Sequence, residues 1–232
     1  MKILPAITTI TPNLWREKIL EIDRLGLKEV AAFVTVLNPV ERQEFYKLLE
    51  KTKLKKIPFL HLREQDMDER EIEYLISRWG AERFNIHPRE IILLDSFLPD
   101  YRDRIYVENT DLFLDEKYVR NFAGLCIDFS HLESDRVTSP ERYEQIVRLK
   151  DKYAVGCGHA SAIYDKPFNT RLDGSPEPGG PRIDRHYADS NQCFNYLARY
   201  LHESQPPVLA IELENSLAEQ LNFIEYIKKL LK

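Results

Sequence analysis

Metal-ligand side chains recur where the short apolar runs of this chain end. In the stretch CIDFSH, Asp128 ends the run and His131 follows three residues later. Earlier runs end at His61, His87 and Glu108. The later candidates are His159, Asp184, His186, Glu212 and Glu214. Imidazole and carboxylate groups bind zinc, manganese and related divalent metals, so the recurring pattern predicts a metal site.

Such a gathering of groups is chemically reasonable only with a cation. Acidic and histidine side chains crowded at one end of a barrel repel one another or lose protons at a cost in free energy. A bound cation removes that cost. The metal then offers a hydroxide at neutral pH and stabilises a developing oxyanion. A single histidine at a strand end is more often a satisfied core-edge residue. Of the six histidines, however, only His202 falls on an expected helix, and chance is a poor explanation for the other five.

Eight short apolar runs, rich in Ile, Val and Phe and bounded by polar residues, are expected to be β-strands. They cover residues 3–10, 28–36, 56–62, 83–88, 104–110, 124–130, 153–159 and 207–214. Amphipathic segments follow most of them, at a step of roughly 20 to 30 residues. The pattern predicts a single (β/α)8 TIM barrel over residues 1–232, with a doubly wound open sheet as the alternative. In such a barrel the carboxyl ends of the strands form the active-site rim, where the candidate ligands lie.

Helix boundaries are readable at several points. Asn38 and Ser139 each precede a proline, which is typical of a cap residue followed by the first helical position. Ser216 and Glu219 have the spacing of a capping box, and Gly26 is placed to end the first helix in the left-handed conformation.

Two segments depart from this regular alternation. Residues 90–98, EIILLDSFL, are compatible with either a short helix or a loop. Residues 165–181, DKPFNTRLDGSPEPGGP, are rich in glycine and proline, so we expect a long irregular loop after strand seven. Loops of this length within a compact domain are usually functional.

Several other residues are expected to serve packing. Trp15 and Trp79 lie on expected helices, and Gly156 and Gly158 relieve crowding inside a barrel or, alternatively, let the backbone approach a ligand. Cys157 between these glycines has no neighbouring base in the sequence, so we do not expect a catalytic cysteine there.

Composition sets the broad class of protein. The chain has 232 residues, 43% hydrophobic and 31% charged, which is ordinary for a globular protein with a sizeable core. Its net charge of −5 does not indicate a nucleic-acid binder, although a local basic patch is compatible with it. Three cysteines without a CxxC pair predict reduced thiols in a cytoplasmic protein. We expect neither a signal peptide nor a membrane span.

These motifs make the chain resemble the xylose-isomerase-like barrel superfamily, and within it the endonuclease-IV-type AP endonucleases (AP endonuclease family 2). The resemblance rests on the HP of His87, the ENT from Glu108, the DxxH of Asp128 and His131, the DRH from Asp184 to His186, and the strand-eight glutamate. DxxH and the two glutamates are shared with sugar isomerases and epimerases. His61, His87 and DRH together indicate the trinuclear-zinc branch more specifically.

The resemblance implies up to three zinc ions, with manganese as an alternative metal. The implied ligand sets are His61, His87 and Glu108 for one ion, Glu108, Asp128, His159 and Glu212 for the second, and His131, Asp184 and His186 for the third. It also implies hydrolysis of a phosphodiester 5′ to an abasic site by a metal-bound hydroxide. The implied partner is a phosphodiester, with damaged DNA as one candidate; no membrane or protein partner is implied.

Two alternatives remain open. A sugar or sugar-phosphate isomerase or epimerase would use one divalent metal, with Glu108 and Glu212 as the catalytic acid and base. A non-catalytic barrel would keep a metal for structure. Arg63, Arg182 and Arg185 are candidate phosphate-binding residues, because arginine pairs two phosphate oxygens.

The strand-eight ligand is itself ambiguous. Glu212 and Glu214 lie two residues apart, so a strand period of two puts both on one face. We expect Glu212 to be the ligand and Glu214 to contact the substrate.

Overall fold

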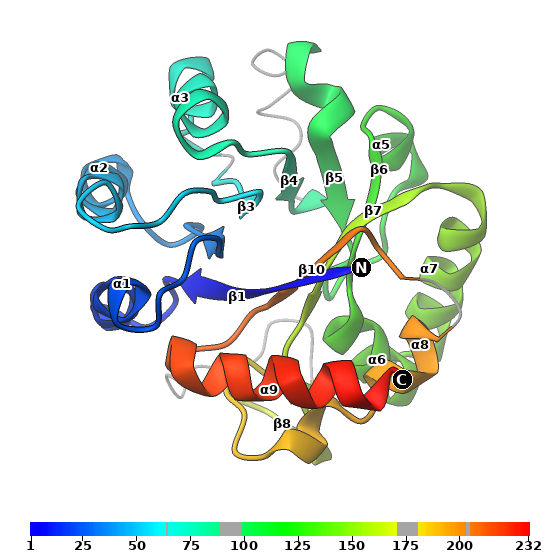
Figure 1. Cartoon of the computed structure of the whole chain (residues 1–232). Helices are drawn as coiled ribbons and strands as arrows, with labels where there is room; N and C mark the ends of the chain where they lie inside the picture. Colours follow the sequence, from blue (N-terminus) through cyan, green and yellow to red (C-terminus); the bar gives the residue numbers. More distant parts are fainter. Residues whose placement is uncertain (64, 89–98, 171–180, 203–204) are drawn as a thin grey trace.

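The chain folds into a closed barrel of eight parallel strands, seen in the computed structural model that describes residues 1–63, 65–88, 99–170, 181–202 and 205–232 (Figure 1). Around the barrel the strand order is β1-β10-β7-β6-β5-β4-β3-β2. These strands are β1 (Lys2–Thr8), β2 (Ala31–Phe33), β3 (Phe59–His61), β4 (Arg83–Ile86), β5 (Ile105–Glu108), β6 (Gly124–Asp128), β7 (Val155–Ala160) and β10 (Val208–Ile211). Each of the eight coincides with one of the apolar runs of the sequence and extends beyond it by at most one residue, so the predicted (β/α)8 barrel is confirmed.

Helices cover the outside of the barrel (Figure 1). They are α1 (Leu14–Arg24), α2 (Pro39–Leu49), α3 (Glu69–Trp79), α5 (Glu116–Arg120), α6 (Phe129–Thr138), α7 (Pro140–Lys152), α8 (Leu197–Leu201) and α9 (Leu217–Leu230), with 3₁₀ helices at Pro99–Arg104 and Asn191–Phe194. Across the described part of the chain, none of the helices combines the length and apolarity needed to span a membrane.

The predicted helix boundaries are largely confirmed. Asn38 and Ser216 each form a full capping box at the start of α2 and α9. Gly26 takes a positive φ of 67° just after α1, as a left-handed cap requires. Ser139 precedes α7 as predicted, but its side chain makes no capping bond. Ser139 also ends α6, and this shared position gives it a backbone conformation outside the usual cap geometry.

A two-stranded antiparallel hairpin follows β7 directly and is not part of the barrel sheet (Figure 1). Its strands are β8 (Ala162–Phe168) and β9 (Arg182–Arg185). The prediction of an irregular loop from residue 165 was therefore wrong at its start, because residues 165–168 belong to β8. Pro167 suits this strand, since an edge pair outside the barrel leaves some backbone N–H groups without a ladder partner. Residues 171–180 and 90–98 lie outside the described part of the chain.

Side chains fill the barrel interior in layers that follow the strand period of two. The lower layer is an apolar cluster made of Leu4, Ala6, Ala31, Phe33, Phe59, Cys126, Cys157, Val208 and Ala210. Two residues beyond members of this layer, toward the carboxyl ends, stand His61, Asp128, His159 and Glu212. These four predicted ligands therefore point into the barrel, one layer above the apolar cluster.

Gly156 and Gly158 relieve crowding, as expected from the sequence. A Cβ atom at Gly156 would lie 1.9 Å from Cε1 of Tyr106, whose ring occupies that space. A Cβ atom at Gly158 would lie 2.7 Å from the ring of Phe129 and 2.8 Å from the Ile127 carbonyl oxygen. Both positions therefore require glycine for packing.

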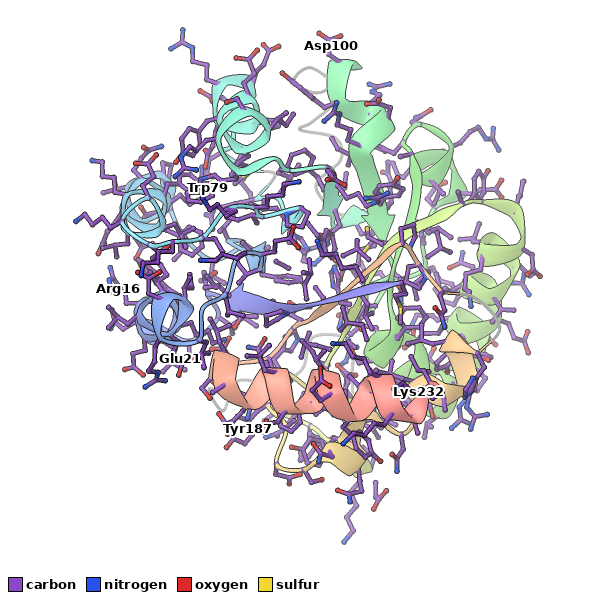
Figure 2. The ribbon with its side chains drawn as sticks, in the orientation of Figure 1. Arg16, Glu21, Trp79, Asp100, Tyr187 and Lys232 are labelled. Carbon is purple, nitrogen blue, oxygen red and sulfur yellow. The ribbon has the colours of Figure 1, made fainter. Side chains whose placement is uncertain are left out.

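The main core lies between the barrel and its helices. Trp15 packs edge-on against Phe45 with ring centroids 5.6 Å apart, and Trp79 is fully buried. Figure 2 shows Trp79 on the inner side of α3, whereas Asp100 lies at the outer edge of the molecule. Both tryptophans are packing residues, as predicted, and Trp15 joins α1 to α2 through Phe45.

Candidate metal centre

Glu108, the last residue of β5, joins two histidines from neighbouring strands. Nε2 of His61 lies 3.0 Å from Oε2 of Glu108, and Nε2 of His87 lies 3.7 Å from Oε1. The two Nε2 atoms are 3.1 Å apart. One ligand atom from each of the three residues falls within a mutual 4.8 Å, which makes the trio able to hold a metal ion.

The same glutamate belongs to a second group, with Asp128 of β6 and His159 of β7. These three also offer ligand atoms within 4.8 Å of one another. Nδ1 of His159 lies 3.8 Å from Oε2 of Glu108 and 3.2 Å from Oε2 of Glu212, which follows β10. Glu108 is therefore shared between two potential ion positions, and Glu212 extends the second of them.

The remaining predicted ligands join this cluster at its edges. Nε2 of His131 lies 3.4 Å from Oδ2 of Asp128 and 3.7 Å from Oδ2 of Asp184. Nδ1 of His186 lies 3.5 Å from Oε1 of Glu212. All nine predicted metal ligands are thus linked by contacts into one cluster.

The third ligand set implied by the resemblance is only partly assembled. His131 and Asp184 meet, but His186 contacts Glu212 instead of joining them. The backbone gives the reason: the N–H of Glu214 donates to the His186 carbonyl at 2.6 Å, which holds His186 beside the end of β10. Among the described residues, the groups with three mutually close ligand atoms are the two that share Glu108.

Three buried ligand atoms have no hydrogen-bond partner among the residues that the structure describes. They are Oδ2 of Asp128, Nδ1 of His159 and Nδ1 of His186. Leaving a buried polar atom unsatisfied costs about 1–3 kcal/mol. All three atoms belong to residues predicted as metal ligands, and carboxylate oxygens and imidazole nitrogens suit zinc or manganese. The residues present therefore fit a divalent cation.

The electrostatics of the cluster couple its carboxylates to its histidines. Burial opposes ionisation of Glu108, but His159, His87 and His61 outweigh it and hold the glutamate pKa well below its usual range. Burial likewise opposes a charged imidazole, yet Glu108 and Glu212 raise the pKa of His159 to about 10. The pKa of Glu212 falls to about 2, because His186 and His159 overcome the effect of burial. Without a cation, a proton on His159 balances part of the buried carboxylate charge.

Asp128 has two separate roles, which explains the spacing in CIDFSH. Its Oδ1 accepts the backbone N–H groups of Ser130 at 2.8 Å and His131 at 2.9 Å, so it caps the N-terminus of α6. Its Oδ2 remains directed at the cluster. The cap places His131 in the first helical turn, three residues on, where its ring can face the same carboxylate.

Two asparagines that position the ligands were not identified from the sequence. Nδ2 of Asn85 donates to Oε2 of Glu108 at 2.5 Å. Nδ2 of Asn109 donates to the Asp128 carbonyl at 3.0 Å, and its Oδ1 accepts the Asp128 N–H at 2.8 Å. A signal existed for Asn85, which stands two residues before His87 and thus on the same face of β4.

The hairpin carries two of the predicted substrate-binding arginines. Nε of Arg182 donates to Oδ1 of Asp184 at 2.9 Å, and the guanidinium of Arg185 stacks 3.6 Å from the ring centroid of Phe168. Nη2 of Arg182 and Nε of Arg185 are buried, and no hydrogen-bond partner for either lies within the described residues.

The third predicted arginine, Arg63, is already engaged. Its guanidinium binds Asp66 at 3.1 Å and the Thr35 carbonyl at 2.8 Å. A substrate would have to compete with both bonds.

The two glutamates after β10 have different surroundings. The strand ends at Ile211, and the N–H of Leu213 turns back to the Ile211 carbonyl at 3.2 Å, so the period of two no longer applies. Glu212 faces the cluster. Glu214 instead accepts hydrogen bonds from the Thr8 hydroxyl and from the backbone N–H of Thr11. These bonds already occupy both oxygens of Glu214, so the two glutamates have different partners.

We compared the sequence and the structure with known proteins. No family model and no curated protein matches the sequence. A crystal structure of an uncharacterized B. cereus protein matches with a TM-score of 0.50 and 9% identity, covering 96% of this chain and 64% of that one. This chain therefore spans less than two thirds of that protein. A xylose isomerase domain protein from Planctomyces limnophilus matches with a TM-score of 0.48 and 13% identity, covering 99% and 95%. At 9% identity, the first of these likenesses supports the barrel fold alone.

Fold and site together define the class of this protein. It is a (β/α)8 barrel with a buried histidine–carboxylate centre, suited to divalent metal, at the carboxyl ends of its strands.

Proposed function

We propose that this protein is a metal-dependent hydrolase that cleaves a phosphodiester at a multinuclear centre. The observation that carries the proposal is the sharing of Glu108 between two three-ligand groups. An enzyme with one metal needs only one such group. Adjacent ions that share a carboxylate are suited to phosphate chemistry, because they can stabilise both the attacking and the leaving oxygen.

The nine clustered residues would hold the ions. We assign His61, His87 and Glu108 to one ion, and Glu108, Asp128, His159 and Glu212 to the next. His131, Asp184 and His186 are the candidates for a third ion, which we propose to be zinc like the others. A bound divalent metal supplies a more acidic water and charge stabilisation on oxygen.

The chain itself supplies anion binding beside this centre. Arg182 is held by Asp184, which in turn contacts His131 at the edge of the cluster. Its buried Nη2 and the buried Nε of Arg185 are unpartnered N–H donors within the described part of the structure. Arginine pairs naturally with phosphate oxygens, so we assign both residues to orienting the phosphate.

An isomerase or epimerase acting on a sugar or sugar phosphate is the second candidate. The observation that favours it is the contact of both Glu108 and Glu212 with Nδ1 of His159, which brings two carboxylates to one ligand. In this reaction Glu108 and Glu212 would transfer protons as base and acid. One ion held by these residues with Asp128 would suffice.

The first experiment measures metal content and activity on the same preparation. Elemental mass spectrometry of protein purified without chelators or a histidine tag gives the ions per chain. Activity is then assayed on bis(p-nitrophenyl) phosphate, on an abasic-site oligonucleotide and on sugar phosphates. Two or three ions with phosphodiester cleavage support the hydrolase. One ion with sugar turnover supports the isomerase, and ions without turnover of any substrate indicate a non-catalytic barrel.

A pair of histidine variants separates the two enzymatic candidates. His186→Ala removes a ligand assigned to the third ion and is expected to abolish phosphodiester cleavage. The same variant should leave an isomerase bound to its single metal. His202→Ala is the matched control, because His202 is exposed at the end of α8 and outside the cluster.

A further inference from the structure

The two ring nitrogens of His159 have different surroundings. Nδ1 faces the carboxylates, 3.2 Å from Glu212 and 3.8 Å from Glu108. Nε2 lies 3.2 Å from Sγ of Cys126. Both His159 and Cys126 are fully buried at 0% exposure. The thiol therefore contacts the nitrogen that is not directed at the metal ligands.

Barrel register brings these two side chains together. In the β6–β7 pair, Asp128 is opposite His159 and Cys126 is opposite Cys157. Cys126 stands one inward layer below Asp128, so its sulfur lies beneath the His159 ring. The rings of Phe33 and Phe59 pack against the same imidazole, at centroid distances of 4.8 Å and 5.4 Å. The ring is thus held by apolar neighbours, and the thiol is the polar atom found at Nε2.

We propose that Cys126 is a positioning residue for the metal centre, whose sulfur accepts the Nε2–H of His159 and so directs the Nδ1 lone pair at the cation. Metal-binding histidines usually donate their second N–H to a carboxylate, a backbone carbonyl or a water. Sulfur is a weaker acceptor but serves the same purpose in a dry site. Cys126 is not a metal ligand in this assignment, since it meets the wrong nitrogen. The inference rests on the metal centre of the proposed function, and not on the reaction catalysed there.

The neighbouring strand provides a matched control for this role. Cys157 has the same side chain, the same 0% exposure and the paired register position, and within the described part of the chain its thiol contacts Cys126 and not His159. Cys126→Ala and Cys157→Ala therefore remove the same atoms from the same apolar layer. Only the first removes the acceptor at Nε2. Cys126→Ser keeps an acceptor, and Cys126→Val keeps the volume without one.

The test measures zinc affinity by competition with a chromophoric chelator. We expect Cys126→Ala to weaken zinc binding by about 10- to 100-fold, the usual effect of losing such a hydrogen bond. Cys157→Ala should leave the affinity unchanged, and Cys126→Ser should recover most of the loss. If Cys126→Ala does not fold, Cys126→Val takes its place. Equal affinities for the Cys126→Ala and Cys157→Ala variants would overturn the inference.

Nitrogen-15 NMR of the His159 ring gives a readout that packing alone would not move. In the zinc-loaded wild type we expect the proton on Nε2 and the metal on Nδ1, and in Cys126→Ala a shifted Nε2 signal. If the wild type binds no divalent cation, the proposed function fails. The metal-free spectrum still decides the role of Cys126 in that case, because an Nε2 signal identical in wild type and Cys126→Ala contradicts the hydrogen bond.

Discussion

The side-chain amide of Asn109 forms hydrogen bonds with both the backbone N–H and the backbone carbonyl of Asp128. Its Nδ2 donates to the Asp128 carbonyl at 3.0 Å, while its Oδ1 accepts the Asp128 N–H at 2.8 Å. The carbonyl of Asn109 itself lies 3.1 Å from Nδ1 of His131. One residue after β5 thus contacts two predicted ligands, Asp128 of β6 through its side chain and His131 of α6 through its backbone carbonyl.

Asn109→Ala should therefore destabilise the protein and weaken metal binding together. Loss of the amide leaves buried backbone groups of Asp128 without partners, at a cost of roughly 2–4 kcal/mol in the free energy of unfolding. Urea denaturation of the metal-free protein measures this cost, and chelator competition measures the affinity. Asn121→Ala, at an exposed helix end, is the control and should change neither. An unaltered zinc affinity in Asn109→Ala would remove Asn109 from the positioning of the site.

Metal binding should release protons. The pKa of His159 is raised to about 10, against the effect of burial, by Glu108 and Glu212, so its imidazole is protonated at neutral pH when no cation is present. A cation at Nδ1 must displace that proton, and affinity should therefore rise by about tenfold per pH unit for each proton released. Isothermal titration calorimetry between pH 6.5 and 8, in buffers with different ionisation enthalpies, counts the protons. A binding enthalpy independent of the buffer would contradict this.

Lys18 should make the free energy of unfolding depend on pH in the alkaline range, above about pH 8. Burial lowers its pKa to about 8 despite Glu214, Glu21 and Glu212, and its Nζ donates to Thr8 and to the Leu213 carbonyl. Between pH 8 and its unfolded pKa of 10.5, the unfolded chain holds a proton that the folded chain lacks. The free energy of unfolding therefore rises with pH across that window.

Lys18→Met isolates this contribution. The difference in unfolding free energy between wild type and variant, measured by urea denaturation with chelator present, should shift in favour of wild type from pH 8 to 10.5. The ceiling is roughly 3 kcal/mol for a shift of this size. A difference that stays constant with pH would show that Lys18 is not buried as a charge.

Because a side chain at Gly156 would collide with Tyr106, substitutions at these two positions should have coupled effects on stability. Gly156→Ala places a methyl group 1.9 Å from the Tyr106 ring, and we expect about 1–3 kcal/mol of destabilisation from overpacking. Tyr106→Leu vacates part of that space, so the double variant should lose less stability than the sum of the single variants. A double-mutant cycle by thermal or urea denaturation measures the coupling, and additivity within about 0.5 kcal/mol would rule out the steric explanation.

Strand positions were predictable because each strand is a local pattern. A run such as GLCID alternates inward and outward side chains, and its last inward residue is a ligand type. The hairpin was missed because AIYDKPF contains Pro167 and charged residues, which suit an edge pair but not a barrel strand. Asn109 and Cys126 were missed because their partners are distant in sequence.

The sequence by itself determined which residues stand at the carboxyl ends of the strands, and hence which nine side chains can meet. Period two and the order of the strands are sufficient for that, because both are properties of the chain. The tertiary structure decided which of them do meet. Closure of the barrel made Glu108 the residue shared by two groups, and the Glu214–His186 backbone bond holds His186 beside Glu212. Glu214 is bound to Thr8 and Thr11, whereas Glu212 contacts the histidines of the cluster. Such choices depend on distances between strands, which register and barrel closure set and local sequence does not.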